Sequence, residues 1–169
     1  MPKPDLIIHD ANVLIALIQA GVLDRCLRDM ARPAVTTDLV LAELTDPQQQ
    51  AAARRAASKN RLIVRGLTSD ELLQVAARSG RGPAALSLPD HSVLWLAQTT
   101  GGTVLSGDGP MRRHAETAGI SLHGLLWLLD RMADAGWPPP DLHRTLCQLL
   151  EHGNRLPHQA TQLRLLKWS

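Results

Sequence analysis

Short apolar runs alternate with helical patterns over residues 1–122, and this alternation constrains the fold more than any other feature of the chain. The apolar runs predict strands at residues 6–8, 34–36, 62–67, 103–106 and 120–122. Strands that alternate with helices form a parallel sheet with helices packed on both of its faces. The sequence therefore predicts an α/β fold, a three-layer α/β/α sandwich around a central parallel sheet.

Local signals predict where the helices between these strands begin. The helix starts are marked by polar capping residues: Thr37, Asp46 followed by Pro47, Thr68 with Glu71, and Ser87. We expect a helix that begins near Asn12 or Val13, another over residues 22–30, one that runs from Pro47 to about Lys59, and one from Thr68 to about Ala77 that is followed by a loop over residues 79–83. Pro110 predicts a helix over residues 110–118 with Gly109 as its cap, which leaves Asp108 one place too early to serve as that cap.

The last third of the chain has only helical patterns. They cover residues 124–135, 141–152 and 159–168, and Pro138, Pro139 and Pro140 predict a rigid break between the first two. A chain of 169 residues suits one domain. We therefore expect a single domain over residues 1–169, with an α/β core over 1–122 and a helical extension over 123–169.

Composition excludes several classes of protein. The chain has no Phe or Tyr and only four Trp, so the core must be aliphatic, and recognition of bases by stacking on exposed rings is disfavoured. Cys26 and Cys147 lie far apart without a metal-binding spacing, which argues against a zinc site and a disulfide and fits a reduced cytoplasm.

Neither a membrane segment nor a strong nucleic-acid signal stands out. No apolar run reaches the roughly 18 residues that cross a bilayer, and the first ten residues lack the core of a signal peptide. We expect a cytoplasmic protein without membrane contact. The formal charge of +2 is too small to indicate a nucleic-acid binder by itself, although basic residues gather at positions 54–65 and 112–114.

Four acidic residues occupy positions that favour chemistry. Asp10 directly follows the first apolar run, Asp108 follows the fourth, Asp90 lies in the first turn of a helix, and Glu43 is the one charge in an otherwise apolar helical stretch. Open α/β folds place their sites at the carboxyl ends of the strands, so Asp10 and Asp108 should lie at the same edge of the sheet. Each acid also has an ordinary explanation, because a carboxylate near a helix start can cap it or interact with its dipole.

A cluster of these four acids would require a cation. Two carboxylates about 4 Å apart repel each other by roughly 4 kcal/mol at an effective dielectric of about 20. Hard oxygen ligands without His or Cys select Mg²⁺ or Mn²⁺, which bind substrate phosphates through their open positions. Such a metal activates water and neutralises charge on a phosphoryl group, so the sequence favours phosphodiester hydrolysis.

Three other α/β classes fit less well. A haloacid-dehalogenase-type phosphatase needs an Asp where this chain has Asn12, and a response-regulator receiver needs a lysine after its last strand, whereas the lysines here are Lys3, Lys59 and Lys167. Dinucleotide binding fails because GDGPMR at residues 107–112 lacks the required glycine spacing.

From Asp5 to about Met132 the chain resembles the PIN-domain family, and within it the small toxin ribonucleases of bacterial toxin–antitoxin pairs. The resemblance rests on four segments in order: DANVLIAL with Asp10, AEL with Glu43, LSLPDHSVLWLA with Asp90, and TVLSGDGPMRRHAETAGI with Ser106 and Asp108. It implies a PIN-like α/β/α fold, a Mg²⁺ or Mn²⁺ site, endoribonuclease activity on RNA, a homodimer, and an antitoxin protein that covers the site.

The resemblance also implies roles for individual residues. Asp10, Asp90 and Asp108 would bind the metal, and Glu43 would complete the catalytic cluster and help to position the attacking water. Asn12 and Ser106 would be supporting polar residues, while Arg112, Arg113 and His114 are candidates for phosphate contacts. The chain departs from the family pattern at SGDGP, where Gly107 and Gly109 flank Asp108 in place of a second acid.

One alternative belongs to a different functional class. A PIN-like module that has lost useful turnover could serve as an RNA-binding or protein-binding partner. All four acids are present, which favours the enzyme, and metal-dependent cleavage would separate the two hypotheses.

Overall fold

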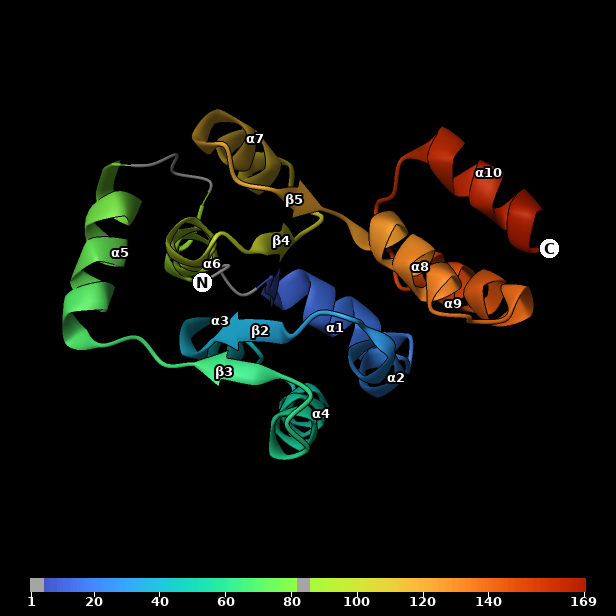
Figure 1. Ribbon diagram of the computed structural model, residues 1–169, viewed down its shortest axis with the longest axis horizontal. Coiled ribbons are helices and arrows are strands. Elements are labelled where there is room, and N and C mark those ends of the chain that lie inside the picture. The colour runs from blue at the N-terminus through green and yellow to red at the C-terminus, as the bar shows by residue number, and fades with distance from the viewer. Residues whose placement is uncertain (1–4, 82–85) are drawn as a thin grey trace.

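The computed structural model describes residues 5–81 and 86–169. At its centre is a five-stranded parallel sheet in the order β3-β2-β1-β4-β5. The strands are β1 (Ile7–His9), β2 (Ala34–Thr37), β3 (Ile63–Arg65), β4 (Thr103–Leu105) and β5 (Leu122–His123). Helices flank this sheet on both sides, so the predicted α/β fold with a central parallel sheet is confirmed (Figure 1).

Helices connect the strands and form the whole of the C-terminal part. They are α1 (Ala11–Gln19), α2 (Leu23–Asp29), α3 (Asp38–Ala42), α4 (Pro47–Ser58), α5 (Ser69–Arg81), α6 (Leu88–Thr100), α7 (Gly109–Ala118), α8 (Leu125–Asp134), α9 (Pro139–Glu151) and α10 (His158–Trp168). In Figure 1, α3, α5 and α6 lie on one side of the sheet, and α1, α2, α8, α9 and α10 lie on the other.

The strand order places a topological switch point between β1 and β4. The chain adds β2 and β3 on one side of β1 and then crosses to add β4 and β5 on the other. His9 pairs with Leu105, so these two strands end at the same level. Ligands of open α/β sheets bind outside the carboxyl ends of the strands at such a point. Asp10 follows β1 and Asp108 lies shortly after β4, one on each side of it.

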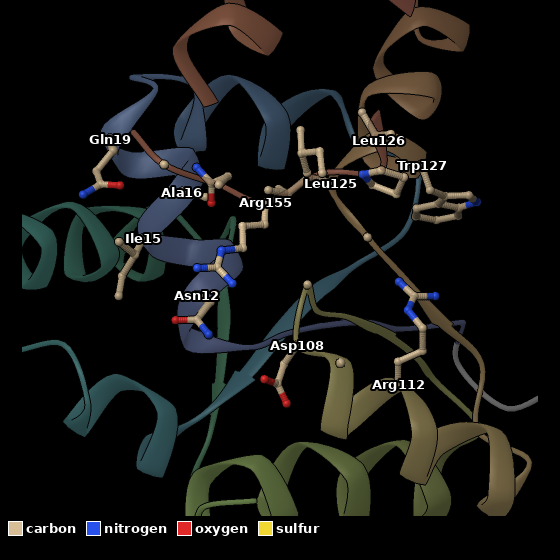
Figure 2. A pocket seen from close by; sticks show the side chains of 17 residues that line it. Asn12, Ile15, Ala16, Gln19, Asp108, Arg112, Leu125, Leu126, Trp127 and Arg155 are labelled. Carbon is tan, nitrogen blue, oxygen red and sulfur yellow. The ribbon is translucent and has the colours of Figure 1, made fainter. Parts of the chain in front are cut away.

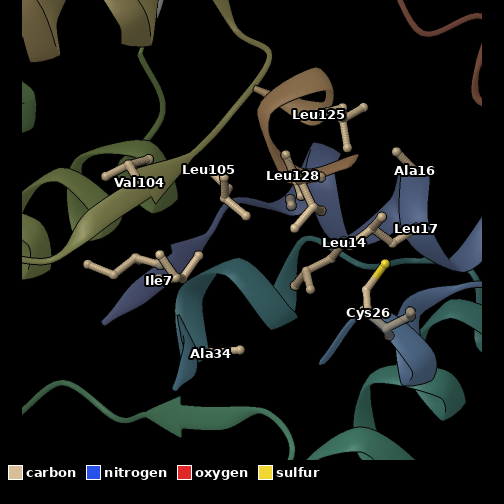
Figure 3. Close-up of a cluster of buried hydrophobic side chains, with 14 of the residues drawn as sticks. Ile7, Leu14, Ala16, Leu17, Cys26, Ala34, Val104, Leu105, Leu125 and Leu128 are labelled. Carbon is tan, nitrogen blue, oxygen red and sulfur yellow. The ribbon is translucent and has the colours of Figure 1, made fainter. Parts of the chain in front are cut away.

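The core is aliphatic, as the composition predicts. Ile7, Leu14, Leu17 and Leu105 are fully buried, and Figure 3 shows them packed with Leu128 of α8 between the sheet and the helices. Burial of a leucine or isoleucine side chain contributes about 1.5–3 kcal/mol. The sheet and the C-terminal helices therefore share one hydrophobic core.

The predicted helix caps are present in the structure. Thr37 Oγ1 accepts a hydrogen bond from Val40 N, Asp46 caps α4, and Thr68 and Glu71 form reciprocal bonds at the start of α5. α4 ends at Ser58, followed by Asn60 with a φ of 56°, a left-handed conformation that asparagine tolerates better than most residues. Each capping residue lies within four residues of the helix end that it stabilises, which explains why these helix ends could be predicted from the sequence.

The prediction for the end of α5 was wrong. The helix continues past Ala77 to Arg81, through three of the residues that were expected to form a loop. Arg78 and Arg81 lie in its last turn, where cations interact favourably with the helix dipole, and α5 packs against α6. Residues 82 and 83 of the predicted loop lie outside the described residues.

The starts of α7 and α9 also differ from expectation. α7 begins at Gly109, so Asp108 and not Gly109 is the cap. α9 begins at Pro139, so Pro139 and Pro140 form its first turn and only Pro138 precedes it. First-turn amides have no partner within the helix, and a proline there costs no hydrogen bond.

The C-terminal helices pack on the same side of the sheet as α1. α9 contacts α1, α8 and α10. Arg164 of α10 forms two hydrogen bonds with the carboxylate of Asp130 of α8, at 2.9 and 2.6 Å, and Trp168 is buried. In the described parts of the chain, no helix combines the length and the apolar character needed to cross a membrane.

Candidate active site

Asp10 and Ser106 form the centre of the candidate site at the switch point. Asp10 N donates to Leu105 O at 3.2 Å, which extends the pairing of β1 with β4 by one residue. Ser106 is fully buried beyond the end of β4, and its hydroxyl accepts from Asp108 N at 3.1 Å. Ser106 thus contacts the acid that follows β4 and lowers the pKa of the acid that follows β1; its supporting role remains a prediction.

The Asp10 carboxylate is buried at the sheet edge, with 3% of the residue exposed. Its pKa is raised from 3.8 to about 6, chiefly by burial and also by the charges of Asp90 and Asp108, while hydrogen bonding to Ser106 and Val13 N acts in the opposite direction. Three of the four predicted acids therefore lie close enough to interact electrostatically.

Glu43 interacts electrostatically with Asp90. It is exposed and follows the last residue of α3, so it is not within the helix as expected. Its pKa is raised by the protein around its carboxylate and by the charge of Asp90, and a hydrogen bond with Ser87 partly offsets this. Asp90 is thus the carboxylate that links Glu43 to Asp10.

Each of the three aspartates also stabilises the start of a helix. Asp10 Oδ1 accepts from Val13 N at 2.7 Å, and Asp108 Oδ2 accepts from Met111 N at 2.9 Å. Asp90 forms a capping box with Ser87: its Oδ2 accepts from Ser87 N at 2.8 Å, and its own amide donates to Ser87 Oγ at 3.2 Å. Capping uses one carboxylate oxygen of each residue and orients the other.

The second question about these acids is whether they can bind a metal ion. Within residues 5–81 and 86–169, no three side chains among His, Cys, Asp and Glu lie close enough together to form a metal-binding group. The donor chemistry nevertheless fits Mg²⁺ or Mn²⁺, because carboxylate oxygens are their preferred protein ligands and both ions keep several waters. Water molecules can therefore bridge carboxylates that do not all touch the ion.

The neighbouring histidine does not neutralise Asp10. His9 is fully buried, and neither of its ring nitrogens has a hydrogen-bond partner among the described residues. Burial lowers its pKa to about 4, so the ring is neutral at physiological pH. The negative charge around Asp10 consequently lacks compensation from this residue.

A cleft of about 750 Å³ opens beside the acids. Asn12, Asp108 and Arg112 line it (Figure 2). Asn12 is exposed and faces the cleft, and no hydrogen bond joins it to Asp10 in the described structure. Of the predicted acids, Asp108 is the one that lines this space.

The three candidates for phosphate contacts are separated by the geometry of α7. Arg112 reaches the cleft. Arg113 is exposed beside Gly109, where an added Cβ would lie 3.4 Å from its Nη1, and His114 packs edge-on against His91 with ring centroids 6.0 Å apart. Successive helical residues point in different directions, so one basic run does not form one binding surface.

Arg155 lines the same cleft, although the sequence analysis did not single it out. It lies in residues 153–157 between α9 and α10, more than forty residues after Asp108, the last of the four predicted acids. The available signal was the GNRLP sequence, in which a turn carries an arginine between two helices. Only packing of the C-terminal helices on α1 brings it to the site.

A family model described as a PIN domain matches residues 6–169. The chain belongs to the PIN-domain family. PIN domains are generally nucleases and typically use divalent metal ions, so the fold is a nuclease-type fold. The match extends to the last residue, and the C-terminal helices of this PIN domain therefore fall inside the family pattern.

Two further comparisons were made, with solved structures and with curated proteins. The crystal structure of PAE2754 from Pyrobaculum aerophilum matches with 23% sequence identity and a TM-score of 0.47, over 77% of this PIN domain and 90% of that chain. No curated protein matches the sequence.

Proposed function

We propose that this PIN domain is a metal-dependent endoribonuclease that hydrolyses RNA phosphodiester bonds with Mg²⁺ or Mn²⁺. The observation that carries the proposal is the buried carboxylate of Asp10, on which the charges of Asp90 and Asp108 act at the switch point of a nuclease-type fold. A buried carboxylate such as that of Asp10, with two further carboxylates acting on it, is costly to ionise unless a cation binds it.

Asp10, Asp90 and Asp108 would hold the cation, directly or through water. When bound, the metal supplies positive charge for the phosphoryl group and acidifies a water molecule. The capping hydrogen bonds keep the carboxylates of all three aspartates in place. The protein thus provides oriented oxygen donors before any substrate arrives.

Glu43 is suited to handle the proton of the attacking water. Its pKa lies above its ordinary value, and a general base works best when its pKa approaches the working pH. As the water oxygen bonds to phosphorus, one of its protons passes to a Glu43 carboxylate oxygen. The bond from phosphorus to the leaving oxygen breaks, and the leaving oxygen keeps the electron pair and takes a proton from solvent. The products are two shorter RNA strands.

The test is an RNA cleavage assay with end-labelled single-stranded RNA. We expect cleavage with Mg²⁺ or Mn²⁺ and none with EDTA, measured on denaturing gels. Asp108→Asn protein, purified in the same way, controls for contaminating ribonucleases. Absence of cleavage with either metal, or equal cleavage by the variant, contradicts the proposal.

The capping bonds favour a second candidate, a PIN-like module without useful turnover that binds RNA or a protein. If the aspartates serve only as caps, they need not bind metal at all. This candidate predicts RNA or protein binding with no metal-dependent cleavage. The same assay therefore separates it from the enzyme.

We further propose that the chain is one domain and acts in the cytoplasm as the toxin of a toxin–antitoxin pair, as a homodimer covered by an antitoxin protein. The support is the resemblance of its four acidic segments to toxin-type PIN domains. Expression in bacteria should arrest growth, and Asp108→Asn should relieve the arrest. A small DNA-binding protein encoded next to the gene should also relieve it, and light scattering would give the oligomeric state.

A further inference from the structure

The C-terminal extension forms one wall of the cleft that contains Asp108. Within the extension, residues 153–157 and the start of α8 line the cleft. The opposite side is formed by α1 and by the turn after β4. A segment outside the predicted α/β core therefore builds part of the candidate active site.

Two arginines lie on either side of Asp108 in this cleft. Figure 2 shows the guanidinium of Arg155 directed toward Asn12 on one side, and Arg112 on the other. Both arginines are exposed, and neither forms an ion pair with any acid in residues 5–81 or 86–169. Both guanidinium groups are therefore available to an anionic ligand.

The segment that carries Arg155 is held in place. Gly153 ends α9 with a φ of +80°, and the next residue, Asn154, donates to Leu149 O from its backbone N at 3.2 Å and from its Nδ2 at 2.8 Å. On the other side of Arg155, Leu156 packs against the core. A cation on an anchored segment loses less conformational entropy when it binds.

We propose that Arg155 and Arg112 bind the phosphates of an RNA strand on the two sides of the scissile bond at Asp108. The inference rests on the proposed function, because it assumes that the substrate is RNA. A guanidinium presents paired N–H donors that match two phosphate oxygens. The same cleft is also lined by Ile15, Leu125 and Leu156, which give it an apolar surface for sugars and bases.

Trp127 at the end of the cleft is not required as a stacking platform. Its ring is already stacked on His123, with centroids 4.5 Å apart and planes inclined by 7°. Arg131 lies over the same ring at 5.4 Å. The strand is therefore bound chiefly through its backbone, and the affinity should depend strongly on salt.

The experiment measures binding of a fluorescein-labelled 12-nucleotide single-stranded RNA by anisotropy, in EDTA and over a series of KCl concentrations. Each phosphate contact to a single strand contributes about 0.7 to the slope of log K against log salt. Arg155→Ala and Arg112→Ala should each reduce the slope by about 0.7 and weaken binding roughly tenfold. Arg155→Lys should keep the slope, because it keeps the charge, and lose part of the affinity.

Arg54→Ala is the matched control, since Arg54 is exposed on α4 and does not line the cleft. It should leave slope and affinity unchanged. Thermal melting should be the same for all variants, because the replaced side chains are exposed. A wild-type slope in Arg155→Ala, an equal loss in Arg54→Ala, or no salt-dependent RNA binding by the wild type would each overturn the inference.

Cleavage by the wild type with Mn²⁺ is measured separately. If the wild type cleaves RNA but Arg155→Ala has the wild-type slope of log K against log salt, the arginine contacts are refuted and the proposed ribonuclease activity is not. Slope losses in both variants without any cleavage support the arginine contacts and overturn the proposed catalysis.

Discussion

Asp90 and Ser87 hold each other at the start of α6 through two reciprocal hydrogen bonds. Asp90 Oδ2 accepts from Ser87 N at 2.8 Å, and Ser87 Oγ accepts from Asp90 N at 3.2 Å. The charge of Asp90 also raises the pKa of Glu43. The same carboxylate is thus a helix cap and a member of the acidic group, and predictions for these acids must treat both roles.

Asp108→Asn and Asp108→Ala should separate capping from catalysis. Asparagine caps helices about as well as aspartate, whereas alanine costs about 1 kcal/mol, so only Asp108→Ala should lower the free energy of unfolding. Both variants should lose RNA cleavage, because neither supplies a carboxylate. Urea unfolding and the gel assay measure the two effects, and wild-type cleavage by Asp108→Asn would refute the assignment.

Mn²⁺ or Mg²⁺ should raise the melting temperature of the wild type. The cation relieves repulsion among Asp10, Asp90 and Asp108 in the folded state only, and a metal at 100 times its Kd contributes about 2.7 kcal/mol. Differential scanning fluorimetry over a metal titration gives the shift, and Asp10→Asn should reduce it. A flat melting temperature up to millimolar metal would count against convergence of the acids.

The metal-free protein should lose stability as pH rises from about 3.8 to about 6, because of Asp10. Burial raises the pKa of Asp10 to about 6, so the folded state holds the proton more tightly than the unfolded state across this window. The loss from this group is on the order of 3 kcal/mol and is complete above pH 6.

The comparison with Asp10→Asn isolates this effect from other titrating groups. Asparagine keeps the oxygen that accepts from Val13 N but does not ionise. In EDTA, the variant should gain stability relative to the wild type as pH rises, as measured by urea unfolding at several pH values. A constant difference between the two proteins would contradict the prediction.

Only Cys147 should react with a thiol reagent in the native protein. Cys26 is fully buried, and burial raises its pKa to about 12, so it has almost no thiolate at pH 8. Cys147 is half-buried on α9. Ellman's reagent should therefore detect one thiol before unfolding and two after it, and the Cys147→Ser variant should show none until it unfolds.

Most of the fold could be predicted from local patterns. The first four strands and most helix starts were correct to within a few residues, because an apolar run or a capping residue acts on its near neighbours. The last strand was predicted at residues 120–122 but lies at Leu122–His123. Errors arose where packing outweighed the local signal. α5 continues through Gly80 to Arg81 against α6, and Glu43 lies just outside α3 instead of within it.

The candidate site was predictable in its parts. Asp10, Ser106 and Asp108 lie next to the ends of β1 and β4, and their order along the chain is visible in the sequence. Asp108 was not predicted to cap α7, because Pro110 was placed at the first helical position. In the structure Pro110 occupies the second position, which leaves Asp108 as the cap. Arg112 could not be distinguished from Arg113 until the orientation of α7 was known.

The sequence by itself determined the alternation of strands and helices, the acids at the strand ends and the caps, because each depends on contacts between near neighbours. The tertiary structure decided that β1 and β4 are adjacent, which places Asp10 and Asp108 on either side of one switch point. It also decided that Arg155 lines the same cleft as Asp108, because long-range burial of apolar surface packs α9 on α1 and carries that arginine into the cleft.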